Sequence, residues 1–553
     1  MKNVGLFFLL LISIIILFSH QTLYANQNDY FVDELKTIKS GTGPLLQSLQ
    51  EYRYTNEPFP IGLLLTRVGK QVTYDTPEGH FRIHFDTIGG HAVYEPDIDV
   101  DPADGYPDYV NRCAEYFEES WMLFDTLGYT MPPYDGQNGG GTDLYDVYMH
   151  HYAGAYGVTF PEDRSNQYPD RSNSYTSYIY VDPNYNGFGY PDRTLPLKVT
   201  VVHEFYHAVQ FSYNLWADIW FMENSSTWSE DVLYDDVNDN YAYLSYFFNV
   251  PHYAHSTENG AHEYGMFVWP QYIFQNYGID AMRIIWEETV YEAVDDALDI
   301  YFGSHGSTLQ ETYRDFIRWN YFTGSRDDQQ HYEEGSHYPL IRMMETYNTL
   351  PVYQEASLRR PSGIGCNYIQ FNNLGSFEGP FRFDVDGANS RSWAMDVIIF
   401  EEDGDIRYEN TDCDPDGIGT IFVTTEEPVD NIVLIVSLLS NQTNQDYLYS
   451  AYIDSFTVVS GSASSAPEKF DILGNYPNPF NSSTVIKFIS PFSSAINFKV
   501  FALSGREVHD SDHKISRGEN SIHWDGEKLP SGIYYYKISG VDSRTVGRMT
   551  LLK

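Results

Sequence analysis

The segment VVHEFYHAVQF contains two histidines four positions apart, His203 and His207, with Glu204 directly after the first. On a helix, side chains at this spacing project from one face one turn apart, about the separation that two ligands of a tetrahedral zinc ion require. A carboxylate beside the first ligand can accept a proton from water whose pKa the zinc lowers, and can later donate it to a leaving group. The motif therefore predicts metal-assisted hydrolysis, with Glu204 as general base and then general acid.

A catalytic zinc ion needs a third protein ligand and one position left for water. The downstream segment WFMENSSTWSED supplies two acidic candidates, Glu223 and Glu230, on a predicted second helix that faces the first. Spacing alone leaves both open as the third ligand.

The two segments together resemble the gluzincin metallopeptidases, in which H-E-x-x-H precedes a tryptophan-led helix with a ligand glutamate and a second acid seven residues later. The resemblance implies Glu223 as the zinc ligand, with Glu230 orienting a ligand histidine. The family's usual Asn before and Gly after the ligand are Met222 and Asn224 here, so Glu230 stays open as the alternative ligand.

Gluzincins also supply a tyrosine or histidine from a later helix to stabilise the oxyanion of the reaction. The resemblance implies Tyr264 in this role, with His262 as the second candidate. A zincin-like fold would also place an edge strand just before the catalytic helix, here residues 177–182, where an extended peptide could pair.

The segment DIDVDPADGYPDYV gathers acidic residues in a turn-rich loop that resembles calcium-binding loops, in which alternate oxygens surround one ion. Carboxylates this close repel one another without a cation, so the loop predicts structural calcium, with a solvated acidic turn as the alternative. The candidate ligands are Asp97, Asp99, Asp101, Asp104 and Asp108.

The hydrophobic pattern indicates which elements must position these residues. Strands such as FRIHF and SYIYVD come first, and helices follow, including an amphipathic one over about 197–213 that carries the zinc motif on its polar side. After residue 350, short alternating runs separated by Gly, Asp and Asn turns indicate β-sandwiches. The predicted fold class is an α+β zincin-like catalytic domain followed by two all-β sandwich domains.

Composition shifts divide the chain further. Lys2, the apolar run 6–18 and the small residue Ala25 form the pattern of a cleaved signal peptide. The predicted divisions are a signal peptide at 1–25, an N-terminal extension or propeptide at 26–80, the catalytic domain at 81–350, a β-sandwich at 351–458, a linker at 459–469 and a C-terminal module at 470–553.

The C-terminal module contains LGNYPNPFNSSTVIKF, VFALSGREV, SGIYYYKI and a terminal RMTLLK. These motifs closely resemble the sorting domain of the type IX secretion system of Bacteroidetes-like bacteria. The resemblance implies that the type IX machinery is a partner, and that the protein is secreted or attached to the outer-membrane surface.

The overall charge limits the partners. Lys and Arg number 33 against 77 Asp and Glu, a net charge of −44 that repels nucleic-acid backbones, so nucleic-acid binding is excluded. After the signal peptide, no run approaches 18 apolar residues, so no transmembrane span is expected in the mature protein.

These observations together predict a secreted zinc metalloendopeptidase that acts on a protein or peptide substrate. The alternative is a non-catalytic cell-surface binding or adhesion protein with a structural metal site. The sequence leaves open the natural substrate and cleavage specificity, an inhibitory role for residues 26–80, release or anchoring of the mature protein, its oligomeric state and the binding of calcium.

Overall fold

A computed structural model describes residues 38–53, 67–136, 138, 140–152, 154–376, 380–424, 428–453, 471–490, 494–502, 506–515, 518–539 and 544–553. The chain divides into two compact units, Met1–Phe456 and Thr457–Lys553. The predicted signal peptide, the predicted linker and much of the predicted N-terminal extension lie outside the described residues. In the part of the chain that is described, no helix has the length and apolarity needed to cross a membrane.

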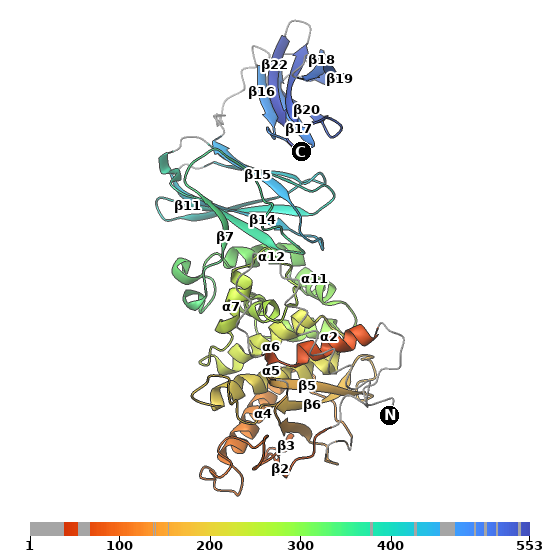
Figure 1. Ribbon diagram of the computed structural model, residues 1–553, viewed down its shortest axis with the longest axis vertical. Coiled ribbons are helices and arrows are strands. Elements are labelled where there is room, and N and C mark those ends of the chain that lie inside the picture. Colours follow the sequence, from red (N-terminus) through yellow and green to blue (C-terminus); the bar gives the residue numbers. More distant parts are fainter. Residues whose placement is uncertain are drawn as a thin grey trace. The chain divides into compact units, whose positions relative to one another are not determined.

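The first unit contains a six-stranded sheet, which is drawn in the lower part of Figure 1. Its strands in spatial order are β1 (Ile38–Ser40), β5 (Ala155–Arg164), β6 (Tyr175–Val181), β4 (Tyr145–Met149), β3 (Phe81–Phe85) and β2 (Val72–Asp75). β4 is buried along its whole length, and β6 along all but its first residue, as expected for strands covered on both faces.

The strand predicted to be a free edge is instead internal. Residues 177–182 fall largely within β6, which pairs with β5 on one side and β4 on the other. The strand outside β6 is β5, whose sequence AYGVTFPEDR carries no clear alternation and contains Gly and Pro. β1, from the N-terminal extension, pairs parallel with β5.

Three helices position the predicted metal ligands and their surroundings: α4 (Asp108–Thr126), α5 (Thr194–Tyr213) and α6 (Ile219–Tyr234). α5 contacts β5 and β6 on one side and both α4 and α6 on others, and it lies between the sheet and α6 in Figure 1. From Val199 onward every residue of α5 is buried, polar ones included. The predicted helix therefore exists, but it is buried on all sides and not on one side only, because neighbours enclose it.

Further helices complete the α-helical layer. They are α2 (Thr42–Arg53), α7 (Tyr241–Phe248), α8 (His262–Gly265), α9 (Val268–Tyr277), α10 (Ala281–Glu288), α11 (Val294–Ser304) and α12 (Leu309–Trp319), with short 3-10 turns at Gly324–Arg326 and Gly335–His337. A capping box starts α12, since the Thr308 hydroxyl accepts from the Glu311 backbone N–H while the Glu311 carboxylate accepts from that of Thr308.

A two-sheet β-sandwich follows within the same unit. One sheet has the order β13 (Ile418–Val423), β10 (Phe381–Gly387), β15 (Tyr447–Ile453), β8 (Val352–Glu355). The other has the order β12 (Ile406–Asp412), β11 (Trp393–Glu401), β14 (Val429–Leu438), β9 (Cys366–Phe371), β7 (Met343–Tyr347). Arg314 and Arg318 of α12 both pair with the buried Asp396 carboxylate of β11, at 2.9 and 2.8 Å, so the helical layer and the sandwich are joined.

The second unit is a smaller β-sandwich with its own apolar core. One sheet has the order β16 (Asp471–Tyr476), β17 (Ser483–Ser490), β20 (Gly518–Asp525). The other has the order β19 (Glu507–Ile515), β18 (Ser494–Ala502), β21 (Gly532–Ser539), β22 (Arg544–Leu551). In the described residues, strands and helices come first and the two sandwiches follow. The zincin-like assignment of the first part stays a prediction.

Candidate metal centre

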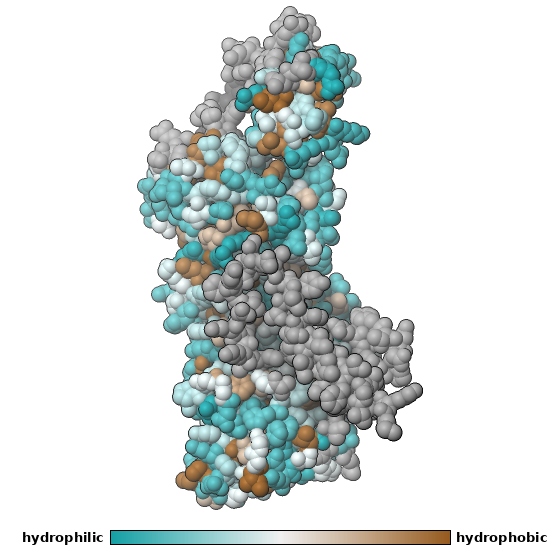
Figure 2. All heavy atoms as spheres, viewed as in Figure 1, coloured by the Kyte–Doolittle hydropathy of each residue, from teal (hydrophilic) through white to brown (hydrophobic). Residues whose placement is uncertain are grey.

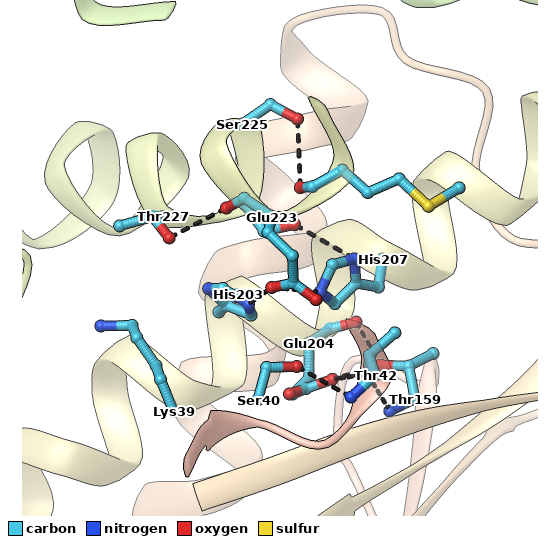
Figure 3. A network of polar contacts seen from close by, with 12 residues as sticks. Lys39, Ser40, Thr42, Thr159, His203, Glu204, His207, Glu223, Ser225 and Thr227 are labelled. Carbon is cyan, nitrogen blue, oxygen red and sulfur yellow. Dashed lines mark hydrogen bonds and ion pairs between the residues drawn. The ribbon is translucent and has the colours of Figure 1, made fainter. Parts of the chain in front are cut away.

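Three ligand-type side chains converge where α5 packs on α6. His203 Nε2 lies 3.1 Å from Glu223 Oε2, and His207 Nε2 lies 3.5 Å from the same oxygen. One ligand atom from each residue falls within 4.8 Å of the others. Figure 3 shows the Glu223 side chain extending from α6 to the two imidazoles on α5. The four-residue spacing of the histidines therefore places both rings against one carboxylate.

The second nitrogen of each imidazole is held by a neighbour. His203 Nδ1 lies 2.8 Å from Glu230 Oε1, and His207 Nδ1 lies 2.8 Å from Gln210 Oε1. These contacts fix each ring orientation and leave Nε2 facing Glu223, as second contacts do in histidine metal sites. Glu230 lies behind His203, and Glu223 lies between the two histidines.

Unpaired polar atoms test whether the residues suit a metal ion. Within the described residues, His207 Nε2 and Glu223 Oε1 are buried without a hydrogen-bond partner. Burial of such atoms is costly unless something binds them. Two imidazole nitrogens and one carboxylate oxygen are a donor set that zinc takes in hydrolytic sites. The residues present therefore fit a zinc ion.

Electrostatics at the centre also favour a cation. Burial opposes protonation of His203, but hydrogen bonds to Glu223 and Glu230 outweigh it and raise the pKa of His203 to about 9. Burial would raise the pKa of Glu223, yet His207 and His203 lower it to about 2. The carboxylates thus create a negative potential that holds positive charge at the imidazoles.

Glu204 lies on the sheet side of α5 and is fully buried. Its Oε2 accepts hydrogen bonds from the Thr42 hydroxyl at 2.7 Å and the Thr159 hydroxyl at 2.8 Å, whereas its Oε1 has no partner among the described residues. Gly157 of β5 makes room for it, because a Cβ there would lie 2.7 Å from Glu204 Cγ. The carboxylate is therefore held in one orientation with one oxygen unpaired.

Of the two predicted oxyanion donors, the structure places Tyr264 beside the centre. Its ring centroid lies 6.2 Å from that of His203. Burial, and then the charge of Glu223, raise the pKa of Tyr264 well above its usual value, so its phenol stays protonated. His262 packs instead against the rings of Phe247 and Tyr253, and burial lowers its pKa to about 3.

Several residues of the centre were not predicted. Gln210 could have been found, since it lies one helical turn after His207. Thr159, Thr42 and Lys39 could not, because each reaches the centre from an element distant in sequence. Lys39 Nζ lies 2.6 Å from Glu230 Oε2 and also pairs with Asp239.

Carboxylates of the acidic loop at 97–108 accept hydrogen bonds from the loop's own backbone. Asp99 accepts backbone hydrogen bonds from Asp104 and Gly105, each at 3.0 Å, and Asp108 accepts them from Val100 and Asp101 at 2.7 and 3.0 Å. Among the described residues, the clusters of carboxylates close enough to share a metal ion include none of Asp97, Asp99, Asp101, Asp104 and Asp108. The Asp99 and Asp108 carboxylates therefore hold the turn, and calcium here stays a prediction.

Comparison with known proteins identifies the C-terminal unit. A family model described as a secretion system C-terminal sorting domain matches residues 475–551. The protein therefore carries a type IX sorting domain, and it is secreted or attached to the cell surface. A search of curated proteins finds no match to this sequence.

Solved structures similar to the chain include glycoside hydrolases. A β-glucuronidase from Bacteroides uniformis is 11% identical over 39% of this chain and 29% of its own, with a TM-score of 0.18. A β-1,2-glucanase from Parabacteroides distasonis is 12% identical over 37% of this chain and 31% of its own, with a TM-score of 0.15. A GH2 β-galacturonidase from Eisenbergiella tayi is 9% identical over 37% of this chain and 43% of its own, with a TM-score of 0.16. This chain thus spans less than half the length of each.

The predicted identity as a zinc metalloendopeptidase is contradicted by these comparisons, because the three similar structures named above are glycoside hydrolases. The peptide substrate falls with that identity. Because the TM-scores are 0.18 and below, the same structures give this chain no glycosidase activity. A function has to be argued from the buried residues of the first unit.

Proposed function

We propose that the first unit binds one zinc ion through His203, His207 and Glu223 and uses it in a hydrolytic reaction. The observation that carries the proposal is the convergence of these three ligand atoms, with His207 Nε2 and Glu223 Oε1 buried and unpaired within the described residues. A bound zinc ion supplies a Lewis acid that lowers the pKa of water. The proposal covers the metal and the proton chemistry and names no peptide substrate.

The chain's own residues have separate roles in this proposal. Glu204 accepts a proton at its unpaired Oε1 while Thr159 of β5 holds Oε2, and it then returns the proton to the leaving group. The protonated phenol of Tyr264 donates a hydrogen bond to negative charge that develops in the transition state. Glu230 and Gln210 keep the two imidazoles oriented.

The number of ligands favours a catalytic site over a structural one. A structural zinc site is closed by four protein ligands, whereas a catalytic site keeps a position for water. Among the described residues, the cluster around His203 holds three ligand side chains. Glu204, the nearest further carboxylate on α5, is instead held by Thr42 and Thr159.

Metal content of purified variants tests the site. The wild-type protein should hold about one zinc ion per chain by mass spectrometry, the number that one such ligand set binds. His203→Ala and Glu223→Ala should lose the ion, whereas Glu204→Gln and the exposed control His305→Ala should keep it. A wild-type protein without metal would overturn the proposal.

Activity of the same variants tests the chemistry. A panel of chromogenic esters, glycosides and amides would be screened for hydrolysis that a chelator abolishes. On any substrate found, Glu204→Gln should reduce the rate about a hundredfold or more, because it removes the proton acceptor while the metal stays bound. Equal hydrolysis by Glu204→Gln and wild type would contradict the assigned role.

A further inference from the structure

The N-terminal segment made of β1 and α2, residues 38–53, lies directly against the metal centre. β1 pairs parallel with the outer edge of β5, with Ile38 opposite Ala155 and Ser40 opposite Gly157. The Gly41 backbone N–H continues the pairing by donating to the Gly157 carbonyl at 2.8 Å. The sheet edge nearest to Glu204 is therefore occupied by the chain itself.

Two residues of this segment contact the groups assigned to chemistry. The Thr42 hydroxyl donates to Glu204 Oε2 at 2.7 Å and accepts from the Thr159 backbone N–H, also at 2.7 Å. Gly43 lies so close to the ligand carboxylate that a Cβ on it would be 2.6 Å from Glu223 Oε1. Figure 3 shows Ser40 and Thr42 beside Glu204, on the sheet side of the helix that carries the histidines.

A buried lysine anchors the segment. Lys39 Nζ lies 2.6 Å from Glu230 Oε2 and pairs with Asp239, and its side chain is 3% exposed. Glu230 also contacts His203 Nδ1, so only the Glu230 carboxylate separates Lys39 from a proposed metal ligand. Leu46 and Leu49 of α2 add burial in the core of the first unit. Removal of Lys39 would leave the buried Glu230 and Asp239 carboxylates without their cation, so the segment should open more easily without it.

The side chains of the metal centre are enclosed in this arrangement. His203 is 1% exposed, and Glu204, His207 and Glu223 are 0% exposed. Hydrolysis needs a substrate bond within reach of Glu204, on the side where Thr42 and Gly43 lie.

We propose that residues 38–53 are an autoinhibitory segment, which occupies the substrate side of the metal centre and must be displaced before the enzyme acts. This inference rests on the proposed function. The Lys39 ion pairs hold the segment in place. The Thr42 hydroxyl donates a hydrogen bond to the general base Glu204, and Gly43 allows the backbone to approach the Glu223 carboxylate.

Two substitutions displace the segment by different means in the full chain. Lys39→Met removes the anchor and leaves a side chain of similar length. Gly43→Ala places a Cβ 2.6 Å from Glu223 Oε1, which is closer than the two atoms can remain. The matched controls are Lys70→Met, which removes a lysine that is 1% exposed and pairs with Asp86 at 2.9 Å, and Gly69→Ala, whose Cβ would meet nothing within 4 Å.

The readouts are the rate at which a chelator removes zinc, hydrogen exchange at the Gly41 amide, and hydrolysis of the best substrate in the chromogenic panel. Both test variants should lose zinc about tenfold faster or more, exchange Gly41 faster and hydrolyse faster by a similar factor, because opening of the segment costs less free energy. Both controls should match the wild type.

Three results would separate the possibilities. If the wild type holds no zinc, the proposed function fails first. If the wild type holds zinc and both test variants release it at the wild-type rate, the proposed function stands and the autoinhibitory segment is wrong. Faster zinc loss with slower hydrolysis in both variants would also overturn it, since that pattern reports damage at Glu223 or Glu230 and not the opening of a site.

Discussion

At the scale of single residues, each imidazole of the metal centre is held in its orientation by a partner on its second nitrogen. His207 depends on Gln210, whose side-chain amide nitrogen lies within hydrogen-bond distance, 3.1 Å, of the Met222 carbonyl and of the Ser225 and Ser226 hydroxyls. These contacts connect the His207 imidazole on α5 to the start of α6. Gln210 thereby connects the two helices that supply the ligands.

The substitution Gln210→Met tests that dependence. Methionine keeps the length of the side chain but removes the acceptor for His207 Nδ1, so zinc affinity should fall about tenfold, the usual effect of losing such a partner. Competition with a chromogenic chelator measures the dissociation constant. Gln271→Met, at a site that is 4% exposed on α9, is the control and should bind zinc as the wild type does. Equal affinity in the two variants would remove Gln210 from the site.

The centre shows which parts of a site a sequence can predict. The helical period predicts that His203 and His207 share a face, and the structure places Glu223, which the resemblance implied as the third ligand, 3.1 and 3.5 Å from their Nε2 atoms. The roles of Lys39 and Thr42 could not be predicted from the sequence, because their partners Glu230 and Glu204 lie 191 and 162 positions away. Such contacts depend on sheet pairing between β1 and β5, which no local pattern indicates.

At the scale of elements, β5 brings the sheet unusually close to α5 at Gly157. A Cβ at this position would lie 2.7 Å from both Glu204 Cγ and Thr200 Cγ2, and 3.1 Å from the Tyr180 carbonyl. The helix can approach the sheet this closely only because the strand carries no side chain there. The same close approach sets the position of the Glu204 carboxylate.

Gly157→Ala should therefore destabilise the first unit by about 1–3 kcal/mol, the cost of overpacking a close-packed core. Urea unfolding followed by tryptophan fluorescence gives the free energy of unfolding. Gly303→Ala on α11 is the matched control, because its Cβ would meet nothing within 4 Å, and alanine in a helix should leave stability equal or slightly higher. A Gly157→Ala protein as stable as the wild type would show that the helix can move away from the strand without cost.

Strand β10 of the middle sandwich carries a carboxylate whose protonation should link stability to pH. Burial, and then repulsion from Asp414, raise the pKa of Asp386 from 3.8 to about 6. The folded state binds this proton more tightly than the unfolded state, so the contribution is present below pH 4 and is lost as the pH rises through 6. Above that pH, the folded protein carries a buried charge.

Asp386→Asn removes the charge and should stabilise the first unit by about 1–2 kcal/mol at pH 8. The gain should shrink as the pH falls through 6 and vanish near pH 4, because the wild-type carboxyl is then neutral as well. Thermal unfolding of the wild type and of Asp386→Asn between pH 4 and pH 8 measures this gain in stability. Asp170→Asn, at an exposed position, should change stability equally little at every pH. A gain independent of pH would contradict the shifted pKa.

Elements were predicted best where the pattern is local. The strand FRIHF is β3, and the helix predicted at about 197–213 is α5. β5 was missed because Gly157 and Pro161 interrupt its apolar run. The one-sided burial predicted for α5 was wrong, because the sheet, α4 and α6 together enclose the helix.

At the scale of the whole molecule, the surface fits the composition. Described residues on the face drawn in Figure 2 are mostly hydrophilic, with apolar residues in small separate spots. This agrees with 77 acidic residues against 33 basic ones. The division into units also separates two tasks, because the metal centre lies wholly within Met1–Phe456 and the sorting domain match within Thr457–Lys553.

The two units should therefore be separable. The second unit builds its core from its own residues, including Phe498, Trp524 and Tyr536, and its sheets contain no strand of the first unit. A chain that ends at Phe456 should keep its zinc and its urea midpoint, because none of the contacts at the metal centre is removed. It should no longer leave the cell, because the sorting domain is absent.

A single substitution tests whether export needs the folded second unit or only its presence in the chain. Trp524 is 2% exposed in the core of the second unit, and Trp524→Ala should cost that unit about 3–5 kcal/mol and block export of the full chain. Tyr535→Ala, at a site that is 37% exposed, should be exported normally. Immunoblots of medium, surface and periplasmic fractions measure the distribution. If the chain ending at Phe456 lost zinc, the second unit would have to support the metal centre, and the separation of tasks would be wrong.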